Sequence, residues 1–289
     1  MLTEQILRQP AIVTAFCGVL TIALILVLAR RLRGTTLIAA LAWAVVAVFA
    51  IGAVEFLKVR GSVLAGSSAQ ITLRYVAAIT TFCPLMAVLG AKRPQHRAWQ
   101  MIVLSLWCVL ALPAAESFFV RRGAAVQIHD ARSWFLWVLL LTGGLNYAGT
   151  RHGLSALLAG IAQMILLGEH LPAWRRPVTA TGVTVAMTLF LIAVLLVLIR
   201  SEKRILWGRG NLSRDPDDLW SEFRNLFGTF WTLRISERFN VQAKLNHWPV
   251  ELGYYGFRPA AAARDGLADE PRQFLSSLLS RFISHDRFA

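Results

Sequence analysis

Charged residues are scarce in this sequence, and the acidic ones are concentrated near its end. Of the 289 residues only 16% are charged and 56% are hydrophobic, whereas an average soluble domain is about one-quarter charged. Residues 1–200 contain five acidic residues and 17 Lys or Arg, while residues 201–289 contain 11 and 13. The shortage of charge in residues 1–200 excludes an ordinary soluble domain and is typical of a membrane-embedded one.

Cysteine is also rare, and its placement excludes a disulfide framework and a thiolate metal site. Cys17, Cys83 and Cys108 all lie within apolar runs, with no CxxC pair and no Cys/His ligand spacing. No P-loop, GxSxG, HExxH or GxGxxG motif occurs in a suitable context. We therefore expect no metal ion, no other cofactor and no catalytic residue, which favours a non-enzymatic protein.

Two histidines bracket a predicted membrane segment, and their spacing argues against haem. His152 and His170 lie at opposite ends of residues 153–171, about 27 Å apart along a helix. A haem held by two histidines needs a pair on facing helices. These histidines are expected at the membrane interface instead.

The basic residues point to a membrane rather than to nucleic acid. The net charge of +14 is distributed as short groups between apolar runs, and a nucleic-acid surface would require clustering on a soluble module. Short basic groups of this kind mark loops on the cytoplasmic side of a membrane. We expect the lipid bilayer as a partner and no nucleic acid.

Long apolar runs are what the sequence does contain. Residues 178–199 carry no charge over 22 positions and are followed by Arg200, Lys203 and Arg204, and this length is sufficient to cross the ~30 Å hydrocarbon core. Similar runs precede it. We predict an all-α, polytopic membrane bundle with spans at about residues 11–29, 35–56, 71–91, 98–115, 133–149, 153–171 and 178–199.

The basic loops predict an orientation for these seven helices. Three arginines within Arg30–Arg33 follow the first span and only Arg8 precedes it, which places the N-terminus outside and the C-terminus inside. Residues 1–200 would form the transmembrane domain in a bacterial cytoplasmic (inner) membrane, and residues 201–289 a cytoplasmic tail. Segment 153–171 is the weakest span, and a re-entrant hairpin is its alternative.

The tail contains two predicted amphipathic helices, at about 216–246 and 271–285. Asp215 is placed to cap the first helix, His247-Trp248-Pro249 to end it, and Pro259–Arg264 forms a linker. An aromatic stripe on the first helix could bind a partner, lie on the bilayer or pack on the spans. Its candidate partner-binding residues are Leu219, Trp220, Phe223, Phe227, Phe230 and Trp231.

A second candidate site is a set of ionisable residues near the outer ends of the predicted helices. Such residues are costly inside a membrane and are either paired, functional or interfacial. We expect Arg74 to pair with at least one of the acidic members. The set consists of Glu55, Arg74, Glu116, Glu169 and His170.

Two runs resemble uncharacterised multi-span membrane proteins of planctomycete-type bacteria. They are CPLMAVLGAKRPQHRAWQMIVLSLW at 83–107 and FRNLFGTFWTLRISERFN at 223–240. The resemblance implies a membrane protein and no particular activity.

Three classes of function follow from these features. The favoured one is an accessory, assembly or scaffold component of a membrane complex that binds a protein partner through its tail. The first alternative is a small-solute or ion transporter that uses the outer polar residues, with a polar cavity near Cys83-Pro84 and Gln163. The second is an intramembrane enzyme, for which the sequence lacks a convergent nucleophile and base.

Overall fold

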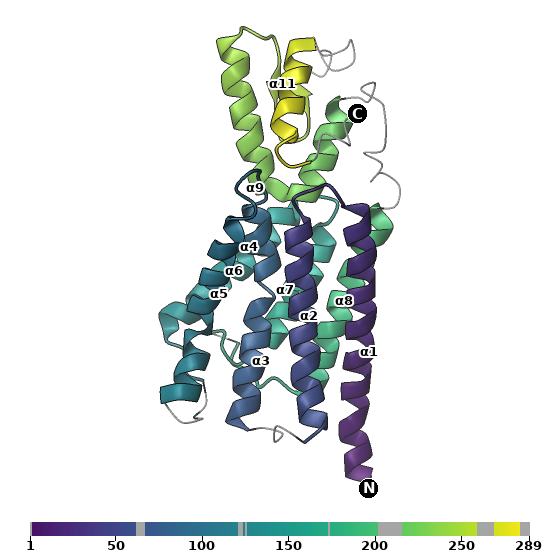
Figure 1. Ribbon diagram of the computed structural model, residues 1–289, viewed down its shortest axis with the longest axis vertical. Helices are drawn as coiled ribbons and strands as arrows, with labels where there is room; N and C mark the ends of the chain where they lie inside the picture. The colour runs from purple at the N-terminus through teal and green to yellow at the C-terminus, as the bar shows by residue number, and fades with distance from the viewer. Residues whose placement is uncertain are drawn as a thin grey trace.

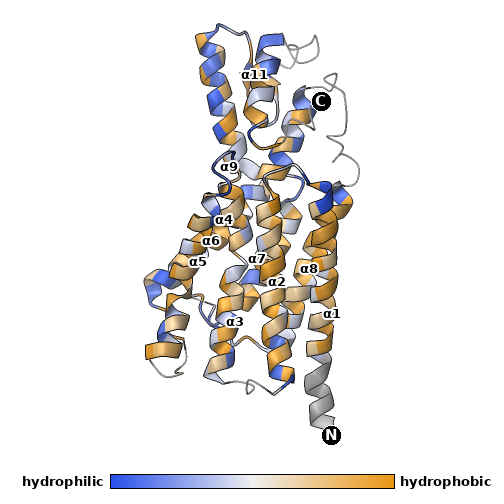
Figure 2. Cartoon of the chain, in the orientation of Figure 1, coloured by the Kyte–Doolittle hydropathy of each residue, from blue (hydrophilic) through white to orange (hydrophobic). Residues whose placement is uncertain are grey.

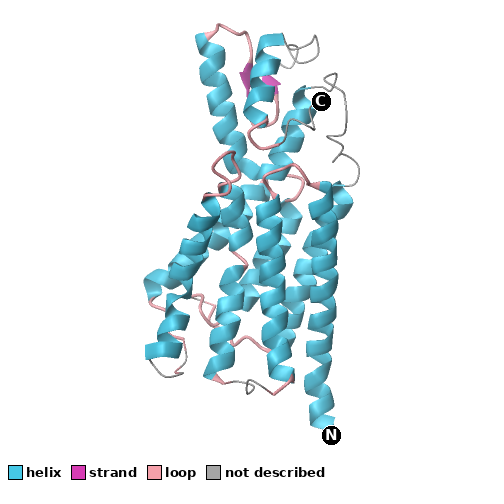
Figure 3. Ribbon diagram, in the orientation of Figure 1, coloured by secondary structure: helices cyan, strands magenta, loops and turns pink. Residues whose placement is uncertain are grey.

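The computed structural model of the chain is almost entirely helical (Figures 1 and 3). It describes residues 2–61, 67–120, 124, 126–172, 174–201, 216–258 and 269–283, with side chains from Pro10 onward except that of Ser201. The predicted cap Asp215, the basic residues Lys203 and Arg204, the linker Pro259–Arg264 and the end of segment 271–285 lie outside these residues.

A bundle of long helices carries a smaller helical unit on one end (Figure 1). The bundle contains α1 (Leu2–Arg31), α2 (Ile38–Val59), α3 (Ser68–Thr80), α4 (Cys83–Leu89), α5 (Trp99–Ala115) with the π-helical turn η1 (Glu116–Val120), α6 (Asp130–Ala148), α7 (Gly153–Leu166) and α8 (Ala180–Ser201). The smaller unit contains α9 (Pro216–Leu245), the hairpin β1 (Glu251–Leu252) and β2 (Phe257–Arg258), and α11 (Asp269–Leu279).

The bundle has the architecture of a multi-span membrane protein, as the sequence predicts. Five helical segments of the described chain are long and apolar enough to cross a membrane: Pro10–Arg31, Ile38–Val59, Ser68–Leu89, Trp99–Val120 and Ala180–Arg200. They form the apolar, orange body of the molecule in Figure 2. The predicted spans 133–149 and 153–171 are not among them, because α6 begins with two charged residues and α7 has only 14 residues.

The predicted span 71–91 is broken near Cys83-Pro84 into two helices. α3 ends at Thr80 and α4 begins at Cys83, with Pro84 in its first turn. Proline has no backbone N–H to continue the helical ladder and clashes with the preceding turn. The break is packed tightly, since Ile79, Phe82 and Cys83 are fully buried.

The tail helix α9 bends sharply at Gly228, whereas the sequence predicted one continuous helix. The backbone of Gly228 has φ 79° and ψ −179°, a conformation essentially restricted to glycine. The bend divides α9 into two arms, 216–227 and 229–245. Both arms pack against α11 or the turn that follows it, and Phe282 lies 5.1 Å from the rings of Phe223 and Phe227 and 4.9 Å from that of Trp231.

The tail is hydrogen-bonded to the end of the bundle at three separate places. The indole of Trp231 donates to the carbonyl of Val88 at 2.8 Å, and the amide of Thr36 donates to the carbonyl of Phe282 at 3.0 Å. At the bend, the amide of Phe230 donates to Asn146 Oδ1 at 3.0 Å. These bonds join α9 and the C-terminal turn to the ends of α4 and α6 and to the loop between α1 and α2.

Candidate functional site

Most of the aromatic stripe on α9 lies inside the protein. Trp220, Phe223 and Phe227 are 0% exposed and Trp231 is 5% exposed. Their rings pack on one another and on Phe282. In this arrangement the chain itself covers these four candidate partner-binding residues. Of the other two, Leu219 is half-buried and Phe230 is 45% exposed.

Three of the five ionisable residues meet around the backbone of Val178. Arg74 pairs with Glu55 at 2.6 Å, which confirms the predicted pairing, and it also donates to the Val178 carbonyl at 2.7 Å. Glu169 accepts from the Val178 amide at 2.8 Å. These bonds connect α2, α3 and the segment leading into α8, so this part of the set has a structural role.

The other two residues, Glu116 and His170, do not join that pair. Glu116 lies 3.8 Å from Arg132 with both side chains largely exposed, and His170 packs edge-on against Tyr75 at 4.8 Å. Together with Glu169 they line an open polar hollow of about 680 Å³. Within the described residues no group of three potential ligands is placed to hold a metal ion.

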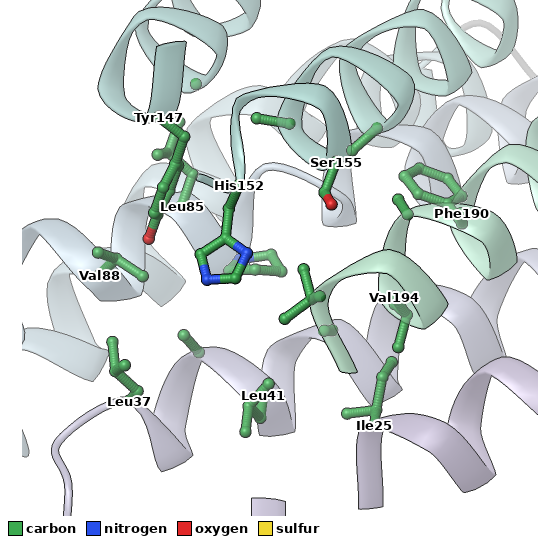
Figure 4. Close-up of a pocket in the computed structure, with 18 of the residues that line it drawn as sticks. Ile25, Leu37, Leu41, Leu85, Val88, Tyr147, His152, Ser155, Phe190 and Val194 are labelled. Carbon is green, nitrogen blue, oxygen red and sulfur yellow. The ribbon is translucent and has the colours of Figure 1, made fainter. Parts of the chain in front are cut away.

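An apolar cavity, partly open to the outside, lies among the helices of the bundle, toward the tail (Figure 4). This cavity of about 320 Å³ is surrounded by α1, α2, α4, α6, α7 and α8. Small side chains on α6 and α7 leave the space open, and a Cβ added to Gly144 or Gly160 would meet no atom within 4 Å. Asn225 and Leu226, from the first arm of α9, contribute to its lining. We call this space the central cavity.

Two polar atoms in the central cavity have no hydrogen-bond partner in the described part of the chain. They are His152 Nδ1 and Ser155 Oγ, both buried. Figure 4 shows the ring of His152 and the hydroxyl of Ser155 directed into the cavity. A buried polar atom without a partner costs about 1–3 kcal/mol. The two atoms are therefore placed to bind a polar group of a ligand.

Two other polar side chains of the cavity hold its wall together. Gln163 Nε2 donates to the carbonyl and hydroxyl oxygens of Thr81 at 3.0 and 3.1 Å, which ties α7 to the break between α3 and α4. Asn225 Oδ1 accepts from the amide of Arg151 at 3.0 Å. His152 Nδ1 and Ser155 Oγ differ from these atoms in being buried without a partner in the described part of the chain.

The central cavity carries no formal charge. Among the described residues, no Asp, Glu, Lys or Arg lines it. Burial, together with the charges of the nearby Arg151 and Arg200, lowers the pKa of His152 to about 4. The imidazole is therefore neutral at pH 7, and its Nε2 accepts from Arg151 Nε at 3.3 Å.

The cavity does not contain an activated nucleophile. Catalysis by Ser155 would require a hydrogen bond to a base, and Ser155 Oγ makes none within the described residues. Cys83 does not line the cavity. The arrangement is suited to binding rather than to covalent chemistry.

Sequence reasoning placed a polar cavity, as the mark of a transporter, near Cys83-Pro84 and Gln163. Pro84 and Gln163 do line the central cavity, but its lining is mainly apolar and does not include Cys83. The sequence analysis expected His152 at the membrane interface and did not consider Ser155. The available signal was the small-residue pattern on two successive helices, Gly143-Gly144 and Ala156, Ala159 and Gly160.

No family model, no curated protein and no solved structure matches the chain. The resemblance to planctomycete-type membrane proteins stays a prediction.

Proposed function

We propose that the chain spans a bacterial inner membrane seven times, with its N-terminus outside and its tail in the cytoplasm. The tail is docked at the bundle end that carries the three arginines of Arg30–Arg33, Lys92 and Arg151, and such basic ends face the cytoplasm. α6 and α7 supply the additional pair of crossings. The chain after α7 supports this, because Leu167 and Leu171 are fully buried as it continues past the short helix.

We further propose that this membrane protein binds an uncharged, largely apolar molecule in the central cavity. The observation that carries the proposal is an apolar cavity of about 320 Å³ with two buried polar atoms, His152 Nδ1 and Ser155 Oγ, that lack partners within the described chain. Small-molecule sites have this character: ~300–1,000 Å³, mainly apolar, with a few polar groups that orient the ligand.

The lack of charge in the cavity defines the ligand class. Moving an ion into an apolar site costs several kcal/mol unless an opposite charge compensates it. The cavity lining offers none. A hydroxyl or carbonyl group on the ligand could instead bond to His152 and Ser155. Ion transport through this cavity is therefore disfavoured. Transport of a neutral solute would be consistent with the proposal.

A cavity-filling substitution tests this proposal. Gly160→Leu places a large side chain in open space within the cavity, and Gly52→Leu is the matched control, because Gly52 also has open space but lies outside the cavity. In detergent micelles, pyrene should show saturable binding to the wild type and to Gly52→Leu. Its affinity for Gly160→Leu should be at least about tenfold weaker, since a difference of 1.4 kcal/mol is sufficient for that factor.

The charge of the probe provides the second arm of this experiment. Pyrene sulfonate has the same ring system and should not bind saturably. Equal pyrene binding by Gly160→Leu and Gly52→Leu, or equal binding of the neutral and sulfonated probes by the wild type, would exclude the proposed site.

A second candidate function is the accessory, assembly or scaffold role. It is favoured by exposed apolar side chains on the second arm of α9, where Leu233, Val241 and Leu245 are 54%, 56% and 68% exposed. Positions four apart lie on one helix face. If this face binds a protein, Val241→Asp with Leu245→Asp should remove specific proteins from the purified complex. An unchanged set of co-purified proteins would contradict this role.

A further inference from the structure

Five cationic side chains from three separate segments gather where the tail meets the bundle. Lys92 and Arg93 lie in the loop between α4 and α5, Arg234 and Arg238 on the second arm of α9, and Arg281 in the turn after α11. We call them the junction cluster. Figure 2 shows the loop between α4 and α5 in blue beside the base of α9.

Hydrogen bonds between the segments fix the position of the junction cluster. The amide of Arg93 donates to the carbonyl of Arg281 at 2.8 Å. The bond from Trp231 to Val88 holds the second arm beside the end of α4, and the guanidinium of Arg234 lies 5.7 Å from the Trp231 ring. The cations are thus held together by the fold of the tail on the bundle, rather than by their order in the sequence.

No carboxylate neutralises the cluster within the described part of the chain. None of its five members forms an ion pair there, including with Glu237, which lies between Arg234 and Arg238 in the sequence. Arg93 Nη2 has a neutral acceptor, the carbonyl of Gly34 at 3.1 Å. Burial, followed by the charges of Arg238, Arg281 and Arg234, lowers the pKa of Lys92. Mutual repulsion of this kind would be relieved by a bound anion.

The position of the cluster along the bundle indicates which anion is available. Its loop joins two candidate spans, Ser68–Leu89 and Trp99–Val120. Trp99, at the start of the second span, donates its indole N–H to the carbonyl of Met86 at 2.8 Å. Tryptophan is enriched at membrane interfaces, at the level of the lipid headgroups. The cations therefore lie at the bilayer surface, next to lipid phosphates.

We propose that the junction cluster binds the headgroup phosphate of an anionic phospholipid in the leaflet on the tail side. Basic pockets beside membrane helices bind anionic headgroups in this way, and each Lys or Arg near the surface contributes to the attraction. Because the loop between α4 and α5, α9 and the turn after α11 all supply cations, the bound lipid also strengthens the attachment of the tail to the bundle. This site is separate from the central cavity, and neither proposal depends on the other.

Lipid titration of the purified full chain tests the proposal. The unfolding midpoint in micelles should rise on addition of phosphatidylglycerol and stay unchanged with phosphatidylcholine of the same acyl chains. The double variant Arg234→Ala/Arg238→Ala should bind phosphatidylglycerol about thirtyfold more weakly, or about fivefold per arginine. Lys244→Ala/Arg258→Ala is the matched control, since it removes two exposed cations outside the cluster and should bind like the wild type.

A second variant and two other anions complete the test. Arg281→Ala, on a different segment, should weaken binding about fivefold, and binding by the wild type should weaken as salt is raised. The proposal is overturned if both lipids act alike, or if the control loses as much affinity as the double variant. It is also overturned if inorganic phosphate or a DNA duplex at equal phosphate concentration raises the midpoint as much as phosphatidylglycerol.

Discussion

Replacing Arg74 by Ala is expected to lower the free energy of unfolding by about 3 kcal/mol, the lower end of the range for breaking a buried ion pair, because the carboxylate of Glu55 then keeps only Lys58, 3.9 Å away, as an ionic partner. The side chains of Glu55 and Arg74 are only 5% and 14% exposed, and their charged atoms lie 2.6 Å apart. Arg74 also donates to the Val178 carbonyl, so the substitution releases the segment that leads into α8. Denaturant titration followed by circular dichroism in micelles measures the loss.

The exposed pair between Arg132 and Glu116 is the matched control. These side chains are 43% and 47% exposed and their charged atoms are 3.8 Å apart, so Arg132→Ala should cost less than about 1 kcal/mol. Glu55→Leu combined with Arg74→Met should recover much of the loss, since an apolar pair can replace a buried ion pair. If Arg74→Ala and Arg132→Ala have equal effects, Glu55 and Arg74 do not form the structural connection described above.

The helices were the part of the fold most accessible from sequence. Uncharged runs of span length can satisfy their backbone only as helices inside a membrane, and Ile38–Val59 and Ala180–Ser201 lie within three residues of the predicted segments 35–56 and 178–199. The pairing of Arg74 was also predictable, because an isolated charge at that depth is too costly. Which of the three glutamates pairs with Arg74 could not be predicted, because the choice depends on how α2 and α3 pack.

Hydrophobic periodicity was insufficient to predict the bend in the tail helix α9. The apolar spacing from Leu219 to Leu233 is helical throughout, and it contains no proline to indicate a break. The bend at Gly228 is held by a residue of a distant helix, because the amide of Phe230 donates to Asn146 Oδ1. The bend turns Trp220, Phe223, Phe227 and Trp231 inward, so a stripe that suggested an external partner forms the tail's own core.

The unpaired polar atoms of the central cavity could not have been identified from sequence, for a related reason. A cavity is the space that several packed helices leave unfilled. Its two unpaired polar groups belong to His152 and Ser155, which lie one helical turn apart at the start of α7. Neither residue belongs to a motif. Their significance depends on burial and on missing partners, which are properties of the assembled bundle.

Gly228→Ala is expected to detach the tail from the bundle while the bundle stays folded. The backbone at φ 79° and ψ −179° costs an alanine about 1–3 kcal/mol, and its Cβ would lie 2.7 Å from the backbone oxygen of Asn146. The backbone of Asn146 belongs to α6 and cannot move aside as a flexible side chain could. The bonds from Phe230 to Asn146 and from Trp231 to Val88 should therefore be lost together.

Two measurements on Gly228→Ala distinguish detachment from general unfolding. Detachment transfers Trp231 from a buried site to water, so its fluorescence should shift to longer wavelength and residues 216–258 should become protease-sensitive, while the helical content of the bundle persists. Gly52→Ala is the control, because an added Cβ at Gly52 meets nothing within 4 Å. It should leave both measurements unchanged. A Gly228→Ala protein with wild-type fluorescence and protease resistance would show that neither the strained backbone nor the close approach of Asn146 holds the tail in place.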